Sequence, residues 1–250
     1  MLEHTFWKFH IQTRISASDA DPCLYMRERN EKKIVLVLYV DDGLIASTDQ
    51  QELEIFIEEL KTEFKITSNN ASYFLELEMN QTENGLKIDQ KAHARKILER
   101  FQFSQCKANS TPIGKNSETS QSGKEVPSKF PYRQAVGALM YLMVGTRPDL
   151  AYSVGFLSRS LENPTREDIT RVKRVFRYIS GTLDLGIEYR KDFKKGILEC
   201  FSDADFGGCK STGRSSCGVV INYAGGAISC LSQRQAMVAT SRTESDFREC

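Results

Sequence analysis

The sequence predicts an α+β fold, in which strands and helices occupy separate stretches of the chain. Two observations indicate this class. Short β-branched or alternating runs lie in the first and last parts of the chain, and between them, at residues 131–179, apolar residues recur with a helical period. The 250 residues, 40% of them hydrophobic, suffice for one large domain or two to three small ones.

Residues 32–47, KKIVLVLYVDDGLIAS, predict the first hairpin. We expect its turn at Asp41, Asp42 and Gly43, because glycine permits a positive φ, and this places both aspartates at the hairpin tip. An amphipathic helix over about residues 50–64 should follow. Its N-cap is predicted at Thr48-Asp49.

The next stretch predicts a second hairpin over residues 73–90, since apolar runs flank Asn84-Gly85, a dipeptide suited to a type I′ turn. A short helix is expected at residues 91–101. Residues 110–128 are rich in Ser, Gly, Lys and Glu with almost no apolar side chains, so they predict a linker.

The second half predicts three helices within residues 131–179, separated at Pro148 and at Asn163-Pro164. From Gly196 onward, three short β-like runs predict a meander. A further helix should begin in the last ten residues.

The composition restricts the classes of function that the chain could have. The 34 basic and 33 acidic side chains nearly cancel, so any nucleic-acid binding must use local clusters. No apolar run reaches the ~18 residues of a membrane span, and no membrane partner is expected. The seven cysteines form no C-x-x-C pair, which argues against structural zinc. Their odd number, and an N-terminus without a signal-peptide core, favour reduced thiols in the cytoplasm or nucleus.

The adjacent Asp41 and Asp42 are the first candidate site. Neighbouring carboxylates repel each other, and a shared divalent cation offsets that cost. A solvated Asp-Asp-Gly turn is the alternative. The tetrad Tyr39-Val40-Asp41-Asp42 in an apolar hairpin resembles the polymerase motif of reverse transcriptases, in which such aspartates hold magnesium for phosphoryl transfer.

The resemblance extends along most of the chain to the copia-type LTR retrotransposon Pol polyprotein. It is carried, in order, by SDADPCLY, YFLELEM, PYRQAVGALMYLMVGTRPDLAYSVGFLSR, NPTREDITRVKRVFRYISGT, SDADFGG and GGAISCLSQRQ with TESDF. This resemblance implies a partial reverse transcriptase palm, a helical thumb or connection and a truncated RNase H-like sheet. The implied segments are 1–109 (palm), 110–128 (linker), 129–195 (thumb or connection) and 196–250 (RNase H start).

The resemblance also implies two carboxylate sites that use Mg²⁺ or Mn²⁺. Asp41 and Asp42 match the polymerase metal pair, whose third carboxylate is expected upstream of this chain. Asp203 and Glu244 match the first RNase H carboxylates, and the later ones are expected beyond Cys250. Asp205 is interpreted as a turn residue. Glu244 could also be the last residue of a Ser241-x-x-Glu244 capping box.

A third candidate is a basic helix. Its side chains could contact phosphates, or could form an ordinary solvated face mixed with Glu167 and Asp168. The basic residues of this helix are Arg166, Arg171, Lys173, Arg174 and Arg177, and the last four are the candidate nucleic-acid-binding residues. Three positions depart from the family pattern: Glu76 where glycine is common, Cys209 where an acidic or polar residue is usual, and Cys230 where tryptophan is usual.

The sequence therefore predicts a fragment of a retrotransposon RNA-directed DNA polymerase with RNase H, inactive alone. Its expected partners are an RNA template, an RNA/DNA hybrid and the rest of the Pol polyprotein. The alternative is a domesticated or relic protein that binds nucleic acid without catalysis.

Overall fold

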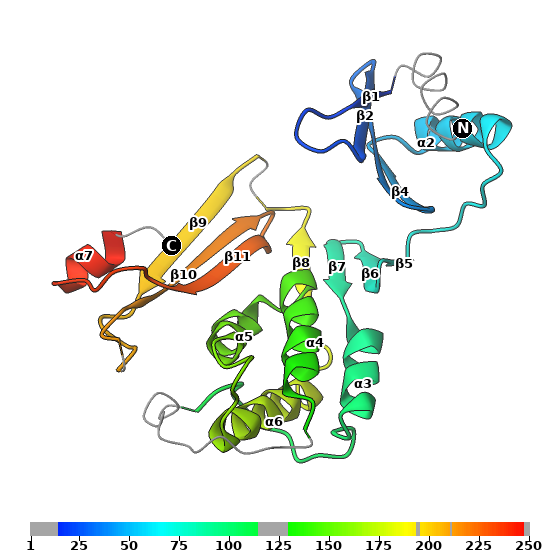
Figure 1. The fold of residues 1–250 in the computed structure, drawn as a ribbon. Coiled ribbons are helices and arrows are strands. Elements are labelled where there is room, and N and C mark those ends of the chain that lie inside the picture. Colours follow the sequence, from blue (N-terminus) through cyan, green and yellow to red (C-terminus); the bar gives the residue numbers. More distant parts are fainter. Residues whose placement is uncertain (1–14, 115–129, 194–195, 211, 248–250) are drawn as a thin grey trace. The chain divides into compact units, whose positions relative to one another are not determined.

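The computed structural model describes residues 15–114, 130–193, 196–210 and 212–247 (Figure 1). The chain forms two compact units, Met1–Phe74 and Leu75–Cys250, and each is described by itself. Sheets and helices are both present, in agreement with the predicted mixture. Residues 115–128 of the predicted linker lie outside the described ranges.

The described part of the first unit is an antiparallel sheet with helix α2 packed on it. The strand order is β1-β2-β3-β4. The elements are β1 (Ser16–Ala17), β2 (Leu24–Arg29), β3 (Lys32–Tyr39), β4 (Asp42–Ser47), α2 (Gln50–Glu63) and β5 (Tyr73–Phe74). Phe56 and Leu60 of α2 pack against Ile34 and Leu36 of β3. Asp49 caps α2 by accepting a hydrogen bond from the Glu52 amide, as predicted.

Strand β2 was not predicted, because the last three residues of its sequence LYMRER are charged. The structure explains how one of them is tolerated. Arg27 is buried, its guanidinium lies 4.7 Å from the centre of the Phe56 ring, and its Nη1 donates to Glu59 Oε2 at 2.8 Å. The arginine stem thus substitutes for an apolar side chain between sheet and helix.

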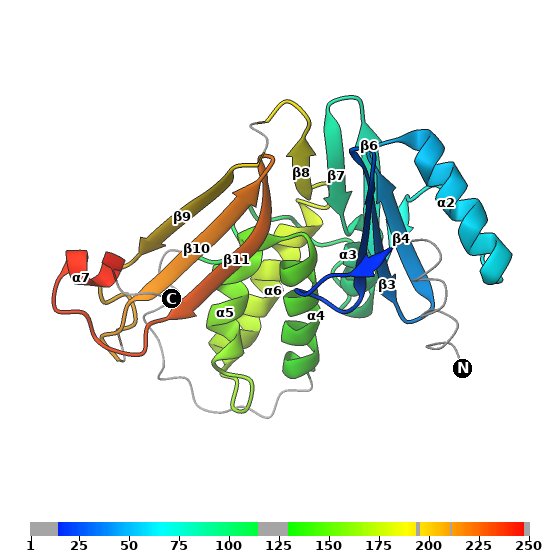
Figure 2. The same cartoon turned by 90° about the horizontal axis from the view of Figure 1, so that it is seen from above.

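The second unit contains four helices around one apolar core, beside an antiparallel sheet in the order β6-β7-β8 (Figures 1 and 2). The elements are β6 (Leu77–Thr82), β7 (Gly85–Asp89), α3 (Lys91–Arg100), α4 (Tyr132–Gly145), η1 (Pro148–Leu150), α5 (Ala151–Ser158), α6 (Arg166–Ser180) and β8 (Ile187–Arg190). Leu139, Val154, Val172 and Phe176 are fully buried. The predicted helices are confirmed, while β8 was missed.

A second sheet in this unit is the predicted meander, in the order β11-β10-β9. Its elements are β9 (Leu198–Ala204), β10 (Ser216–Tyr223), β11 (Gly226–Arg234) and the short helix α7 (Arg242–Phe247). The turn before β11 is joined to β8, because the Arg190 amide donates to Ala224 O at 2.8 Å and the Tyr189 hydroxyl donates to Ala227 O at 2.9 Å. Leu198 and Phe201 on β9 remain more than half exposed.

Both hairpin turns differ from their predictions. Tyr39 pairs with Asp42, so the first turn is Val40-Asp41, and the positive φ falls on Val40 rather than on Gly43. Thr82 pairs with Gly85, so the second turn is Glu83-Asn84. Neither of these residues has the positive φ that a type I′ turn requires, and that prediction was wrong.

Two further expectations concern thiols and membranes. Five described cysteines are free, at positions 23, 106, 200, 209 and 230. Within the part of the chain that the structure describes, no helix has the length and apolar character needed to cross a membrane.

Candidate functional site

The β3–β4 turn carries the first candidate site. Val40 has φ of 55°, a left-handed conformation that is a strained outlier for a β-branched residue. Its side chain is 89% exposed, and Tyr39 beside it is also exposed. Such strain costs about 1–3 kcal/mol and tends to be retained at functional sites. The turn therefore has a backbone conformation that is unfavourable for a valine.

Asp41 and Asp42 are both exposed on this turn. Neither carboxylate forms a hydrogen bond or ion pair with a described residue, so their oxygens are free to bind a cation or solvent. Among the described side chains, no group of three or more His, Cys, Asp or Glu is arranged to hold a metal ion. The turn thus offers two carboxylates and would need further ligands to complete a metal site.

Asp203 and Asp205 lie at the end of β9 and have different surroundings. Asp203 is exposed and pairs in register with Gly218, and among the described residues its carboxylate accepts a hydrogen bond only from the neighbouring Ala204 amide, at 3.0 Å. Asp205 Oδ1 accepts from the Ser216 amide at 2.8 Å and from the Gly208 amide at 3.1 Å. Asp205 therefore braces the loop, as predicted for a turn residue, and Asp203 keeps an accessible carboxylate.

Glu244 lies on α7, which is anchored to the end of β9 because Ser245 Oγ donates to Asp205 O at 2.7 Å (Figure 1). The Glu244 amide donates to Ser241 Oγ at 3.1 Å, which is half of the predicted capping box. The reciprocal half differs: Glu244 Oε2 accepts from the amide and the hydroxyl of Thr240, both at 2.6 Å. The fold brings the two elements together, but the Glu244 carboxylate is engaged by Thr240.

The four residues of α6 that were predicted to contact phosphates fall into two pairs. Arg171 donates to Asp168 at 2.8 Å and to Glu167 at 3.2 Å, and Arg174 donates to Thr111 Oγ1 at 2.8 Å. Lys173 and Arg177 are exposed, although the Lys173 ammonium lies 5.7 Å from the centre of the Phe130 ring. Two of the four side chains are thus held by the protein, and two are accessible to a partner.

A buried polar cluster around Arg147 was not recognised from the sequence. Its guanidinium donates to both oxygens of Asp149 at 2.8–2.9 Å and to the Thr182 carbonyl at 3.0 Å. The Tyr178 hydroxyl also donates to Asp149, and burial together with this carboxylate raises the pKa of Tyr178. Burial and Asp149 likewise raise the pKa of Cys230. The TRPDL sequence signalled only a helix break, so nothing in its pattern indicated this cluster.

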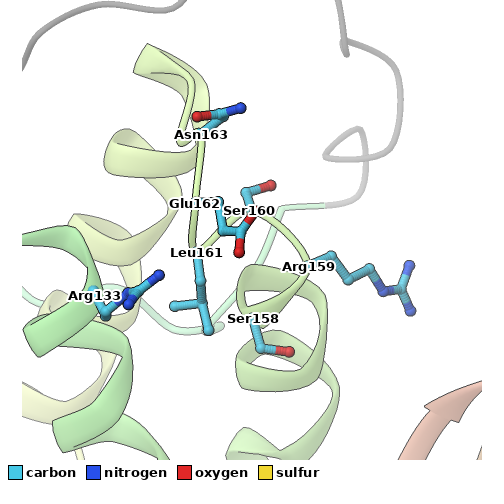
Figure 3. A pocket seen from close by; sticks show the side chains of 7 residues that line it. All are labelled: Arg133, Ser158, Arg159, Ser160, Leu161, Glu162 and Asn163. Atoms are coloured by element: carbon cyan, nitrogen blue, oxygen red, sulfur yellow. The ribbon is translucent and has the colours of Figure 1, made fainter.

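A cavity of about 530 Å³ opens between Arg133 at the start of α4 and residues 158–163, which comprise the last residue of α5 and the segment after it (Figure 3). Its walls carry hydroxyl, carboxylate, amide and guanidinium groups. Figure 3 shows the Arg159 side chain directed away from the other labelled residues, and its Nη2 reaches Ser216 Oγ at 3.5 Å. None of the sequence-predicted site residues lines this cavity.

An exposed aspartate pair thus lies on a strained hairpin tip, in a sheet backed by a helix. Comparison with known proteins identifies the family. Residues 1–115 match the family described as reverse transcriptase (RNA-dependent DNA polymerase). No solved structure matches.

Three relatives are similar over most of the chain. The Retrovirus-related Pol polyprotein from transposon TNT 1-94 of Nicotiana tabacum is 36% identical over 91% of this chain, and the corresponding polyprotein from transposon RE2 of Arabidopsis thaliana is 33% identical over 92%. The Uncharacterized mitochondrial protein AtMg00810 of Arabidopsis thaliana is 34% identical over 85% of this chain and 88% of its own length. The chain belongs to the copia-type retrotransposon Pol family, with a reverse transcriptase domain, and the predicted resemblance is confirmed.

The chain spans 18% of the TNT 1-94 polyprotein and 16% of the RE2 polyprotein. Reverse transcriptases generally use a divalent metal ion. The activity, ion and partners of this particular chain are therefore matters for proposal.

Proposed function

We propose that this chain contributes the metal-binding turn of an RNA-directed DNA polymerase within a Pol polyprotein. The observation that carries the proposal is the position of Asp41 and Asp42. They lie exposed, and free of described partners, on a strained turn inside the stretch that matches the reverse transcriptase family. In this proposal residues 1–109 are palm, 110–128 linker, 129–195 thumb or connection, and 196–250 the start of RNase H.

The donor set fits a hard divalent cation, because Mg²⁺ and Mn²⁺ prefer carboxylate oxygens. Asp41 and Asp42 would help to hold two such ions, which would supply activation of the primer hydroxyl and stabilisation of the leaving pyrophosphate. The protein's part is to fix the two carboxylates. The antiparallel pairing of Tyr39 with Asp42 sets the turn, and the strained Val40 directs the chain through it.

We propose further that Asp203 and Glu244 belong to a ribonuclease site that acts on an RNA/DNA hybrid. The accessible Asp203 carboxylate and the anchoring of α7 at the end of β9 support this assignment. Glu244 would have to exchange its two Thr240 hydrogen bonds for a metal ion. The cytoplasm or nucleus would be the place of action.

The test is a chimera in which this chain replaces the aligned segment of the TNT 1-94 polyprotein. We expect the chimera to incorporate nucleotides on an RNA template and to cleave a hybrid, both with Mg²⁺ and neither with a chelator. The unaltered tobacco polyprotein, purified in parallel, controls for the assay. A folded chimera that binds template and primer but performs neither reaction would favour the non-catalytic alternative.

Nucleic-acid binding without catalysis is the second candidate, and the exposure of Lys173 and Arg177 favours it. We expect the chain to bind duplex DNA weakly, with log K falling by about 0.9 per phosphate contact for each unit of log salt. The double variant Lys173→Gln with Arg177→Gln loses about two phosphate contacts. The slope of log K against log salt should therefore become shallower by the contribution of about two contacts. The measurement is fluorescence anisotropy across a salt series.

Arg174→Gln is the matched control, because Arg174 Nη2 already donates to Thr111. It should leave the slope nearly unchanged. Equal slopes for the wild-type chain and the double variant would indicate that this face of α6 is merely solvated.

A further inference from the structure

The chain enters the second compact unit through two residues of unusual conformation. Leu75 and Glu76 have φ of 51° and 63°, and they directly follow Phe74, the last residue of the first unit. A left-handed φ favours glycine, because in other residues the Cβ approaches the following carbonyl oxygen. Leu75 and Glu76 are the two central residues of the turn between β5 and β6, and a tight two-residue hairpin turn has a positive φ at both of these positions.

Two helices of the second unit contact this turn. The Glu76 carboxylate lies 3.3 Å from Lys96 Nζ and 3.4 Å from His93 Nδ1, both on α3. The Tyr141 hydroxyl of α4 donates to Leu75 O at 3.0 Å, and the Tyr141 ring lies 4.9 Å from the His93 ring. We call Glu76, His93, Lys96 and Tyr141 the junction clamp.

We propose that the junction clamp is a conformational device that fixes the direction in which the chain enters the second unit. Helices α3 and α4 contribute Ile97, Leu98 and Leu139 to the buried core, so they offer a rigid support. Glu76 is a positioning residue: its carboxylate is held from α3 while the carbonyl of the preceding residue is held from α4. Glycine would suit the backbone at position 76 better, but it could not reach α3.

If the junction clamp acts as proposed, Glu76→Gly should change global stability and local order in opposite directions. A glutamate that only stabilised the fold would not produce this pattern. Glu76→Gly should relieve the backbone strain and raise the urea midpoint of the full chain, while order at the junction falls. Glu76→Gln keeps the strain and removes the charge, and Tyr141→Phe removes only the hydroxyl. These two changes should lower order at the junction without raising the midpoint.

The measurement is the backbone amide order parameter of Leu75 and Glu76 by nuclear magnetic relaxation in the full chain. We expect values near the rigid level of about 0.85 in the wild-type protein, falling below about 0.6 when Glu76→Gln and Tyr141→Phe are combined. Glu99→Gln is the control, since Glu99 is an exposed carboxylate on α3 outside the clamp.

Two results would overturn the proposal. One is unchanged order at Leu75 and Glu76 in the combined variant. The other is a junction that becomes more ordered in Glu76→Gly, which would mean that strain alone governs this turn. The measurement does not depend on catalysis, so it stands apart from the test of polymerase function.

Discussion

Asp41→Asn in the tobacco chimera is expected to lower template-directed nucleotide incorporation by about 100-fold or more, while hybrid cleavage stays within about twofold. An asparagine amide is nearly isosteric with the carboxylate but supplies one neutral oxygen, so it weakens a divalent ion held by so few protein ligands. The Asp41 carboxylate forms no hydrogen bond or ion pair with a described residue, so the substitution should leave the fold unaffected.

Asp203→Asn should produce the reverse pattern, with cleavage lost and incorporation kept. Asp203 lies on β9 in the second unit, and Asp41 lies on the β3–β4 turn in the first. Two variants that each remove one activity would show that the chain carries two separate sites. Primer extension and hybrid cleavage, measured on the same preparations, provide the comparison.

Glu31→Gln is the matched control for Asp41→Asn. Glu31 is an exposed carboxylate in the Asn30-Glu31 turn, which joins β3 to β2 at the opposite end of β3 from Asp41. It too has a positive φ, of 62°. If Glu31→Gln reduced incorporation as much as Asp41→Asn did, the loss would reflect disturbance of the hairpin, and the metal-binding assignment would fail.

Sequence periodicity located most elements but not the contacts that decide their details. Helix α2 followed from its apolar spacing and the Asp49 cap, because both signals are local. The pair Asp41-Asp42 was found by its pattern, yet the strained residue between strands is Val40, since strand register and not glycine preference decided where the turn fell. Register depends on pairing across strands, which a local pattern does not contain.

The roles of charged residues were the hardest to predict, because they too depend on contacts that a local sequence pattern does not contain. Arg171 and Lys173 look alike in the sequence, but Arg171 is held by Asp168 and Glu167 while Lys173 is exposed. The distinction depends on which face of α6 packs against α5, where Phe156 lies 5.3 Å from the Arg171 guanidinium. Strand β8 was missed because its four residues gain their support from β7, about a hundred positions earlier.

Gly85 shows how such long-range pairing governs stability. The sequence predicted Gly85 in a type I′ turn, but the structure places it in β7 opposite Arg190 of β8. A Cβ at this position would overlap the Tyr189 carbonyl oxygen and lie 3.0 Å from its carbonyl carbon. These are backbone atoms, which cannot rotate away as a side chain could. The φ of Gly85 is not positive, so a substitution would test this overlap alone.

Gly85→Ala is therefore expected to destabilise the chain by about 3 kcal/mol, at the upper end of the usual cost of overpacking. Gly137→Ala is the matched control: its Cβ would meet nothing within 4 Å, and in the interior of α4 it should stabilise the chain by about 1 kcal/mol. Urea unfolding gives the free energies, and amide exchange of Ile187–Arg190 reports whether β8 has separated from β7. If Gly85→Ala matched Gly137→Ala in sign, or left these amides protected, β8 would not approach β7 as closely as the structure indicates.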